Sequence, residues 1–180
     1  MYKEKTIIVG NGTSILDYRN GNIIDSFGTV IRFNSFKIKG FEEYTGTKTD
    51  VWWTCNLHHA KEPNVIKGVE VIEHSWQWSK DLDKTYKALS KVFENVGKTE
   101  RSFVHSIPIK ASPSTGLIAI WHYVTLGKNL PIYITGFDWW DKPKEVHHYG
   151  DGERRGTLHK PEQELELIQN LAKENKVKFL

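Results

Sequence analysis

Titratable side chains gather in one polar segment near the end of the sequence. In HHYGDGERRGTLHKPEQELE, residues 147–166, His147 and His148 stand beside Tyr149, and His159 follows a loop that contains glycine. Histidine is the side chain whose ordinary pKa lies closest to neutral pH, so it can donate or accept a proton under physiological conditions. General acid–base chemistry is therefore the first function that this segment indicates.

The sequence after His159 predicts that this residue lies at the start of a helix. Pro161 suits the first helical position, and glutamates follow at 162 and 164. The positive end of the helix dipole disfavours an imidazolium, whereas Glu162 or Glu164 would favour it and orient the ring. A neutral His159 could act as a general base. A surface histidine without a catalytic role is the alternative.

The elements that must position these residues follow an alternating pattern. Short apolar runs predict strands at 6–10, 28–34, 49–54, 69–73, 102–107, 131–138 and 177–180, and helical patterns cover 81–97, 112–127 and 159–176. Ser114 or Ser112 is the expected N-cap of the middle helix. The pattern predicts an α/β fold, a Rossmann-like, mainly parallel sheet with helices on both faces, in a single domain over residues 1–180.

Two small-residue loops stand where such a sheet binds ligands. GNGTS (residues 10–14) follows the first expected strand, and SPSTG (residues 112–116) opens the middle helix. Backbone N–H groups there can approach a ligand, and a helix N-terminus favours an anion. Together the loops indicate a phosphate-bearing ligand, although either loop alone is also what an ordinary turn or N-cap requires.

The common nucleotide fingerprints do not fit. Ile15 stands where a dinucleotide fold has its third glycine, and Arg32 and Asn34 stand where it has an acidic residue. No G-K-[ST] sequence closes the first loop. These mismatches argue against NAD and against a P-loop ATPase.

Metal patterns are weak as well. Asp81 and Asp83 form a D-x-D sequence, which some metal-dependent sugar transferases use, but they also suit the acidic first turn of a helix. His58 and His59 lack the spacing and the cysteine partners of a zinc site. We therefore expect no metal and no other cofactor.

Composition sets broader limits. The chain has 180 residues, 38% hydrophobic and 26% charged, with a formal net charge of +3. These values predict a globular protein with no need for a nucleic acid partner. A single cysteine, Cys55, excludes an internal disulfide and favours a reducing compartment, and we expect the thiol to be buried. With no signal pattern and no membrane-spanning run, we expect a cytoplasmic protein of a microbe or a virus, with peripheral membrane attachment left open.

Four segments, in order, resemble the motifs of the animal-type sialyltransferase family. The family's long motif resembles residues 7–52, with GNG and RFN, and its short motif resembles residues 113–138. Its third motif resembles HHYG at 147–150. Its last motif has the form H-x4-E, matched by His159 and Glu164.

The resemblance implies a reaction. The donor would be a CMP-activated sugar acid, typically CMP-sialic acid, and the acceptor a glycan hydroxyl, which would attack with inversion of configuration. A CMP leaving group is already a stable phosphate monoester, so catalysis needs charge stabilisation and a positioned base more than a metal.

The resemblance also implies roles for individual residues. His148 would contact the donor phosphate, His159 would take the proton from the acceptor hydroxyl, and Glu164 would support them. Tyr149, like Trp139 and Trp140, could offer a face to a sugar ring. The implied nucleotide-binding residues are Gly10, Asn11, Gly12, Asn34, Ser114, Thr115, Gly116 and Gly136.

The sequence also departs from the family. It has no cysteine pair for the family's usual disulfide, no recognisable membrane anchor or stem, and a short chain. Alternatives are therefore a non-catalytic CMP- or glycan-binding module, a transferase for another CMP-sugar acid such as CMP-Kdo, and a metal-dependent transferase that uses Asp81 and Asp83. The acceptor, the linkage and the oligomeric state stay open.

Overall fold

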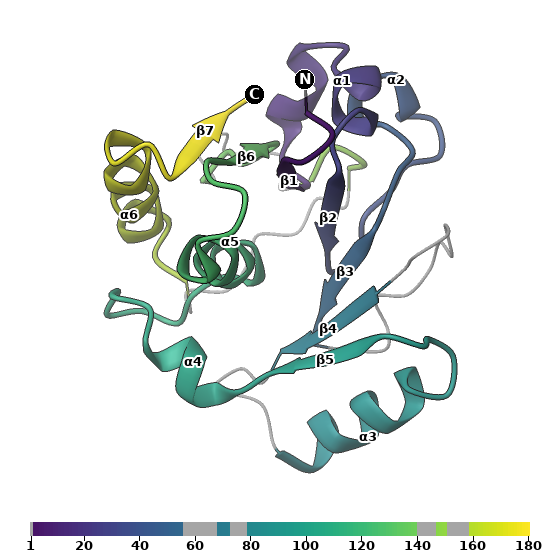
Figure 1. Cartoon of the computed structure of the whole chain (residues 1–180), viewed down its shortest axis with the longest axis vertical. Helices are drawn as coiled ribbons and strands as arrows, with labels where there is room; N and C mark the ends of the chain where they lie inside the picture. Colours follow the sequence, from purple (N-terminus) through teal and green to yellow (C-terminus); the bar gives the residue numbers. More distant parts are fainter. Residues whose placement is uncertain (1, 56–67, 73–78, 140–146, 151–158) are drawn as a thin grey trace.

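A single parallel sheet organises the protein. The structure, a computed structural model, describes residues 2–55, 68–72, 79–139, 147–150 and 159–180 (Figure 1). The described strands are β1 (Thr6–Val9), β2 (Thr29–Phe33), β3 (Val51–Thr54), β4 (Gly68–Ile72), β5 (Val96–Thr99), β6 (Ile132–Thr135) and β7 (Val177–Phe179). They form one sheet in the order β5-β4-β3-β2-β1-β6-β7, and each neighbouring pair is parallel. The predicted Rossmann-like α/β architecture is confirmed.

Helices cover both faces of the sheet, as predicted (Figure 1). One face carries α4 (Arg101–His105), α5 (Thr115–Leu126) and α6 (Pro161–Lys173), and the other carries η1 (Thr13–Asp17), α1 (Gly21–Asp25), α2 (Glu42–Thr45) and α3 (Ser79–Leu89). Successive side chains of a strand point to opposite faces of the sheet, so each strand contributes apolar residues to both helix layers. Ile8 of β1 packs with the α5 and α6 side chains, whereas Ile7 packs with those of η1 and α1. Among the described residues, no helix is both long and apolar enough to span a membrane.

The sheet has its topological switch point between β1 and β6. From β1 the chain builds outward through β2 to β5, then returns to add β6 and β7 on the other side of β1. Connections that leave β1 and β6 in opposite directions open a crevice at the carboxyl ends of these strands. There Gly10 N–H donates to the Thr135 carbonyl at 2.7 Å, and Gly12 N–H donates to the Gly136 carbonyl at 2.8 Å.

Two expected elements differ from the prediction. The helix expected at 81–97 ends at Leu89, and residues 96–99 form β5 instead. The strand expected at 102–107 is wrong, because Arg101–His105 is the short helix α4. Phe103 and Val104 of this helix, and Ile107 just after it, all meet the core cluster of α5, whereas a strand would divide them between two faces.

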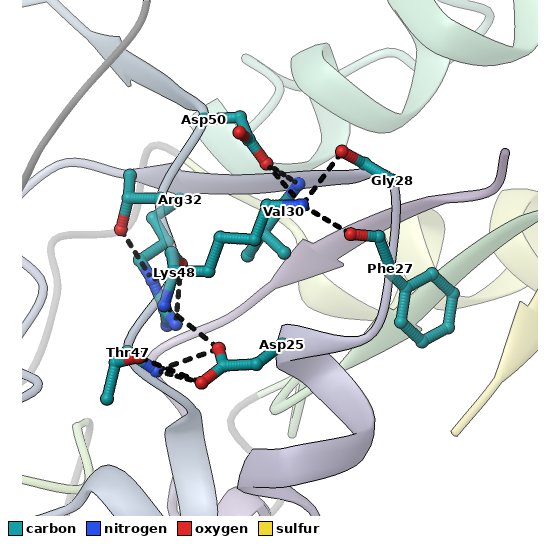
Figure 2. Close-up of polar contacts among 9 residues, drawn as sticks. Asp25, Phe27, Gly28, Val30, Arg32, Thr47, Lys48 and Asp50 are labelled. Atoms are coloured by element: carbon teal, nitrogen blue, oxygen red, sulfur yellow. Dashed lines mark hydrogen bonds and ion pairs between the residues drawn. The ribbon is translucent and has the colours of Figure 1, made fainter. Parts of the chain in front are cut away.

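The buried Arg32 connects β2 to the loop that follows α2 (Figure 2). The Arg32 guanidinium donates to the Thr45 carbonyl at 2.6 Å, to the Lys48 carbonyl at 3.2 Å and to the Thr49 hydroxyl at 3.0 Å. Burial lowers the pKa of Arg32 to about 10, and the charge of Asp25 opposes this shift. Arg32, which stands where a dinucleotide fold has its acidic residue, therefore serves the scaffold by tying β2 to the loop after α2.

Two aspartates brace the same loop from either side (Figure 2). Asp25 accepts from the backbone N–H groups of Thr47 and Lys48, at 2.8 and 2.9 Å. Asp50 accepts from Val30 N–H at 2.9 Å and pairs with the Lys48 ammonium at 3.1 Å. These bonds hold the segment before β3 against the amino-terminal half of β2.

Candidate active site

A pocket lies in this crevice, and its volume of about 480 Å³ includes the solvent at its open mouth. It is formed by the carboxyl ends of β1, β2 and β6 and by the N-termini of α5 and α6. The described lining residues are Asn11, Gly12, Phe33, Ser114, Gly136, Phe137, Asp138, Trp139, Pro161 and Glu164. Residues that were predicted to bind a nucleotide therefore come together from three segments that lie far apart in the sequence.

Glycines let the strand ends approach one another. A Cβ atom on Gly10 would overlap the Gly136 carbonyl oxygen and lie 2.7 Å from its carbon. Gly136 itself has φ of +69°, which favours glycine. A Cβ atom on Gly12 would lie 2.6 Å from the carboxyl carbon of Asp138, and one on Gly116 would lie 2.7 Å from the Phe137 ring. These glycines are therefore required by the packing of the crevice itself.

Asp138 organises the first loop, a role that the sequence analysis missed. Its carboxylate accepts from the Thr13 hydroxyl at 3.0 Å and from Ser14 N–H at 3.2 Å. It thereby joins the segment after β6 to the start of η1, across a separation of 125 residues. The sequence signal was an acidic residue in TGFD, three residues after the end of β6, but only the sheet topology shows which loop this residue meets.

The side chains of Asn11 and Asn34 lie in different surroundings. The Asn11 amide donates to the carbonyls of Phe33 and Ser35, at 3.3 and 3.2 Å, so it links the ends of β1 and β2. Asn34 adopts a positive φ of 54°, and its carbonyl accepts from the Trp52 indole at 3.0 Å. Its buried Oδ1 has no hydrogen-bond partner in the described part of the chain. Asn34 is not among the residues that line the pocket.

Glu164 joins the two helix starts. Its buried carboxylate accepts from Ser114 N–H and from the Ser114 hydroxyl, both at 2.7 Å. The same hydroxyl accepts from Leu117 N–H at 3.2 Å, so Ser114 is the N-cap of α5, one of the two candidates that were predicted. The carboxylate lies at the positive end of the α5 dipole, where a negative charge is stabilised. Thr115 and Gly116 follow directly as the buried first residues of α5.

His148 is held by the backbone on both sides of its ring. Nδ1 lies 3.1 Å from the Asn11 carbonyl oxygen and Nε2 lies 3.0 Å from the Lys37 carbonyl oxygen. Burial lowers the pKa of His148, and the two carbonyls oppose this shift. A neutral ring has one N–H, so it can donate to only one of these carbonyls at a time. Tyr149 donates its hydroxyl to the Ser35 carbonyl, so both residues pack against the loop after β2.

His159 lies at the entrance of α6, as predicted. Its Nδ1 is 2.7 Å from the Ser112 carbonyl oxygen, two residues before the α5 cap. A proton on Nδ1 would donate to this carbonyl and leave the lone pair of a neutral ring on Nε2, the tautomer that a general base requires. His159 does not itself line the described pocket, but Pro161, two residues later, does.

The described residues show no cluster of three or more His, Cys, Asp and Glu side chains placed to hold a metal ion. Asp83 is exposed and lies 3.8 Å from the Lys98 ammonium, and the side chain of Asp81 falls outside the described part. His58 and His59 also fall outside it. Cys55 is buried as predicted, and burial raises the pKa of its thiol to about 11.

The burial of His148 predicts a loss of stability in mild acid. Its folded-state pKa is lowered, so between that value and about 6.5 the unfolded chain binds more protons than the folded one. The free energy of unfolding should therefore fall as the pH drops from 7 toward 5. Urea unfolding at several pH values should show a smaller fall in His148→Gln than in wild type. The exposed His105, changed to Gln, is the control; equal pH slopes in all three proteins would contradict the prediction.

Comparison with known proteins shows what this chain resembles. Residues 3–85 match the family model for glycosyltransferase family 29 (sialyltransferase). A segment of 49 residues is 43% identical to the CMP-N-acetylneuraminate-beta-1,4-galactoside alpha-2,3-sialyltransferase of Rattus norvegicus, and covers 27% of this chain and 13% of the relative. The Homo sapiens protein of the same name is 44% identical over 45 residues, which cover 25% of this chain and 12% of the relative. The matched segments thus span a small fraction of these relatives.

The fold comparison extends further along the chain. A crystal structure of a mammalian sialyltransferase, in complex with Gal-beta-1-3GalNAc-ortho-nitrophenol, superposes with a TM-score of 0.71 at 17% sequence identity. The match covers 98% of this chain and 69% of the other, and at this identity it concerns the fold. The resemblance to the animal-type sialyltransferases is therefore confirmed: residues 3–85 match the model of glycosyltransferase family 29, and the fold is shared over nearly the whole chain.

Proposed function

We propose that this protein is a glycosyltransferase that moves sialic acid, or a related sugar acid, from a CMP-activated donor to a glycan hydroxyl. The observation that carries the proposal is the pocket at the switch point, where Asn11 and Gly12 from the family-matched segment meet Ser114, Gly136 and Glu164. The names of the relatives specify CMP-N-acetylneuraminate as donor and a galactoside as acceptor. We extend the donor class, and not the particular linkage, to this chain.

In the proposed reaction a single displacement exchanges two bonds at the anomeric carbon. The acceptor oxygen forms its bond to that carbon while the bond to the CMP phosphate oxygen breaks, and its electron pair leaves with CMP. His159 takes the acceptor proton on Nε2, with Nδ1 held by Ser112. His148 stabilises the charge on the leaving phosphate, which requires one ring nitrogen to exchange its backbone carbonyl for the phosphate. Displacement from the opposite side inverts the configuration, and no step uses a metal.

The charges around the pocket bear on how the phosphate is held. The described lining residues include two carboxylates and no Lys or Arg. Asp138 and Glu164 are each hydrogen-bonded to a neighbouring loop or cap. Under the proposal, the phosphate depends on the first residues of α5, Thr115 and Gly116, and on His148, which, like His159, lie outside the described lining of the pocket.

A non-catalytic CMP- or glycan-binding module is the second candidate. It is favoured by the position of His159, which is outside the described pocket lining. The two candidates share nucleotide binding and differ in whether product forms. Incubation with CMP-sialic acid, or with CMP-Kdo, and a neutral galactoside therefore separates them by the appearance of a sialylated or Kdo-bearing product.

Thermal melting with nucleotides tests the nucleotide site directly. At 100 times its dissociation constant, CMP should stabilise the protein by about 2.7 kcal/mol. We expect a rise in melting temperature with CMP that EDTA does not change, and no rise with UDP, GDP, NAD or ATP. A rise with UDP or GDP that EDTA removes would instead support a metal site at Asp81 and Asp83. Absence of any rise would refute the nucleotide site.

A further inference from the structure

The loop between β2 and α2, residues 35–41, contacts both the pocket at the switch point and His148. The Ser35 carbonyl oxygen accepts from the side-chain amide of Asn11 at 3.2 Å. The Lys37 carbonyl oxygen lies 3.0 Å from His148 Nε2. Asn11 also lines the pocket at the switch point, here called the switch-point pocket. This loop, here named the 35–41 loop, therefore adjoins the proposed nucleotide site.

The conformation of the 35–41 loop places the side chain of Lys37 over an aromatic ring. Phe41 N–H donates to the Ile38 carbonyl at 2.7 Å, and Ile38 is buried, so the loop turns back on itself. Gly40, within this turn, has a φ of +87°, which favours glycine. The turn brings Lys37 and Phe41 together, and the Lys37 ammonium nitrogen lies 5.7 Å from the centre of the Phe41 ring. This separation is typical of a cation–π contact.

Phe41 lies between this ammonium group and His148. The rings of Phe41 and His148 meet edge to face, with centroids 4.9 Å apart. Burial is the main cause that lowers the pKa of His148, and the charges of Arg32 and Lys37 lower it further. Arg32 is buried and bonded to the loop after α2, whereas Lys37 is exposed and makes no ion pair within the described part of the chain. Of these two cations, Lys37 is therefore the one that a ligand can reach.

A charged donor group near His148 would supply what the switch-point pocket lacks. Under the proposed function the phosphate of the nucleotide contacts His148, and a neutral histidine ring provides a single N–H. None of the described residues that line the switch-point pocket is Lys or Arg. Hydrogen bonds between a charged donor and a phosphate oxygen are about twice as strong as neutral ones. The Lys37 ammonium is a donor of this kind.

We propose that the Lys37 ammonium pairs with the phosphate of the CMP-activated donor, beside His148. This inference rests on the proposed function, since it assigns a further residue of this chain to the same ligand. Lys37 holds one phosphate oxygen while His148 donates to another. The flexible four-carbon side chain allows the ammonium group to move from the Phe41 ring to the phosphate.

Calorimetric titration with CMP and with cytidine, which has no phosphate, tests the assignment. Lys37→Met removes the charge and keeps most of the apolar side chain. We expect it to weaken CMP binding about three- to tenfold and to leave cytidine binding unchanged. Lys37→Arg, which keeps the charge, should bind CMP within about twofold of wild type. Lys39→Met, which removes an exposed lysine two positions further along the same loop, is the matched control and should bind CMP like wild type.

NMR titration of the His148 ring in the free protein supplies a readout that a change in folding alone would not produce. Lys37→Met should raise the pKa of His148, because one of the positive charges that oppose its protonated form is removed. Lys39→Met should leave this pKa at its wild-type value. Arg32 and the backbone carbonyls of Asn11 and Lys37, the other groups that act on the ring, are unchanged in both variants.

The outcomes separate this inference from the proposed function. If wild type binds CMP and Lys37→Met binds it equally well, the inference is overturned and the proposed function is not affected, whatever the pKa of His148. Equal weakening of CMP and cytidine by Lys37→Met, or equal weakening of CMP by Lys37→Met and Lys39→Met, would also overturn the inference alone. If wild type does not bind CMP, the proposed nucleotide site is refuted together with the role of Lys37.

Discussion

Replacing His159 by alanine should lower the rate of transfer by about 10²- to 10⁴-fold while CMP binding stays within about twofold of wild type. The reason is positional. Nδ1 of His159 lies 2.7 Å from the Ser112 carbonyl, which fixes the tautomer that carries its lone pair on Nε2. A general base stabilises the transition state and does not contribute to nucleotide affinity. In His159→Ala the kcat should therefore fall, while CMP should still raise the melting temperature. Product formation and CMP titration on the same preparation measure both quantities.

A second variant separates proton transfer from loop positioning. In His159→Asn the side-chain amide can still donate to the Ser112 carbonyl but cannot accept a proton at neutral pH. If His159 acts as the base, Asn should be as inactive as Ala. The exposed His105, changed to Ala, is the control for loss of a histidine. Recovery of activity in His159→Asn would show that the residue only holds the loop.

Local pattern explains why much of the sheet was predictable. A β-branched run that ends in glycine, as in TIIVG, satisfies both the burial of a central strand and the close approach at its end. The start of α5 was equally local, since Ser114 bonds Leu117 three residues ahead. These features need only a few neighbouring residues. Both features could therefore be predicted from the local sequence.

The errors arise where distant contacts decide. Residues 102–107 have strand-like composition, but α4 is selected because Phe103, Val104 and Ile107 then all reach the core under α5. The residues that complete the crevice depend on still longer separations. Asp138 meets Thr13 across 125 residues, and Glu164 meets Ser114 across 50. No local spacing could pair them: the first pair follows from the adjacency of β1 and β6 in the sheet, and the second from the meeting of the α5 and α6 N-termini.

The crevice itself can be tested by adding one methyl group. In Gly10→Ala the new Cβ would overlap the backbone carbonyl oxygen of Gly136, so β1 and β6 must move apart at their carboxyl ends. Overpacking of this kind costs about 1–3 kcal/mol of stability. Gly10 contacts Gly136, which lines the switch-point pocket, so under the proposed function CMP affinity should fall at least tenfold. Urea unfolding and CMP titration of the same variant measure the two effects.

Gly28→Ala supplies a control with a similar steric defect at the amino-terminal ends of the strands. Its Cβ would overlap the Lys3 carbonyl oxygen, with the carbonyl carbon at 2.8 Å compared with 2.7 Å for Gly10 and Gly136. Gly28 precedes β2, so its defect lies at the amino ends of the strands, away from the pocket. The two variants should lose similar stability, and Gly28→Ala should keep its affinity for CMP. If both variants lost CMP binding equally, general destabilisation would explain the loss. The proposal that the nucleotide binds in the β1–β6 crevice would then be contradicted.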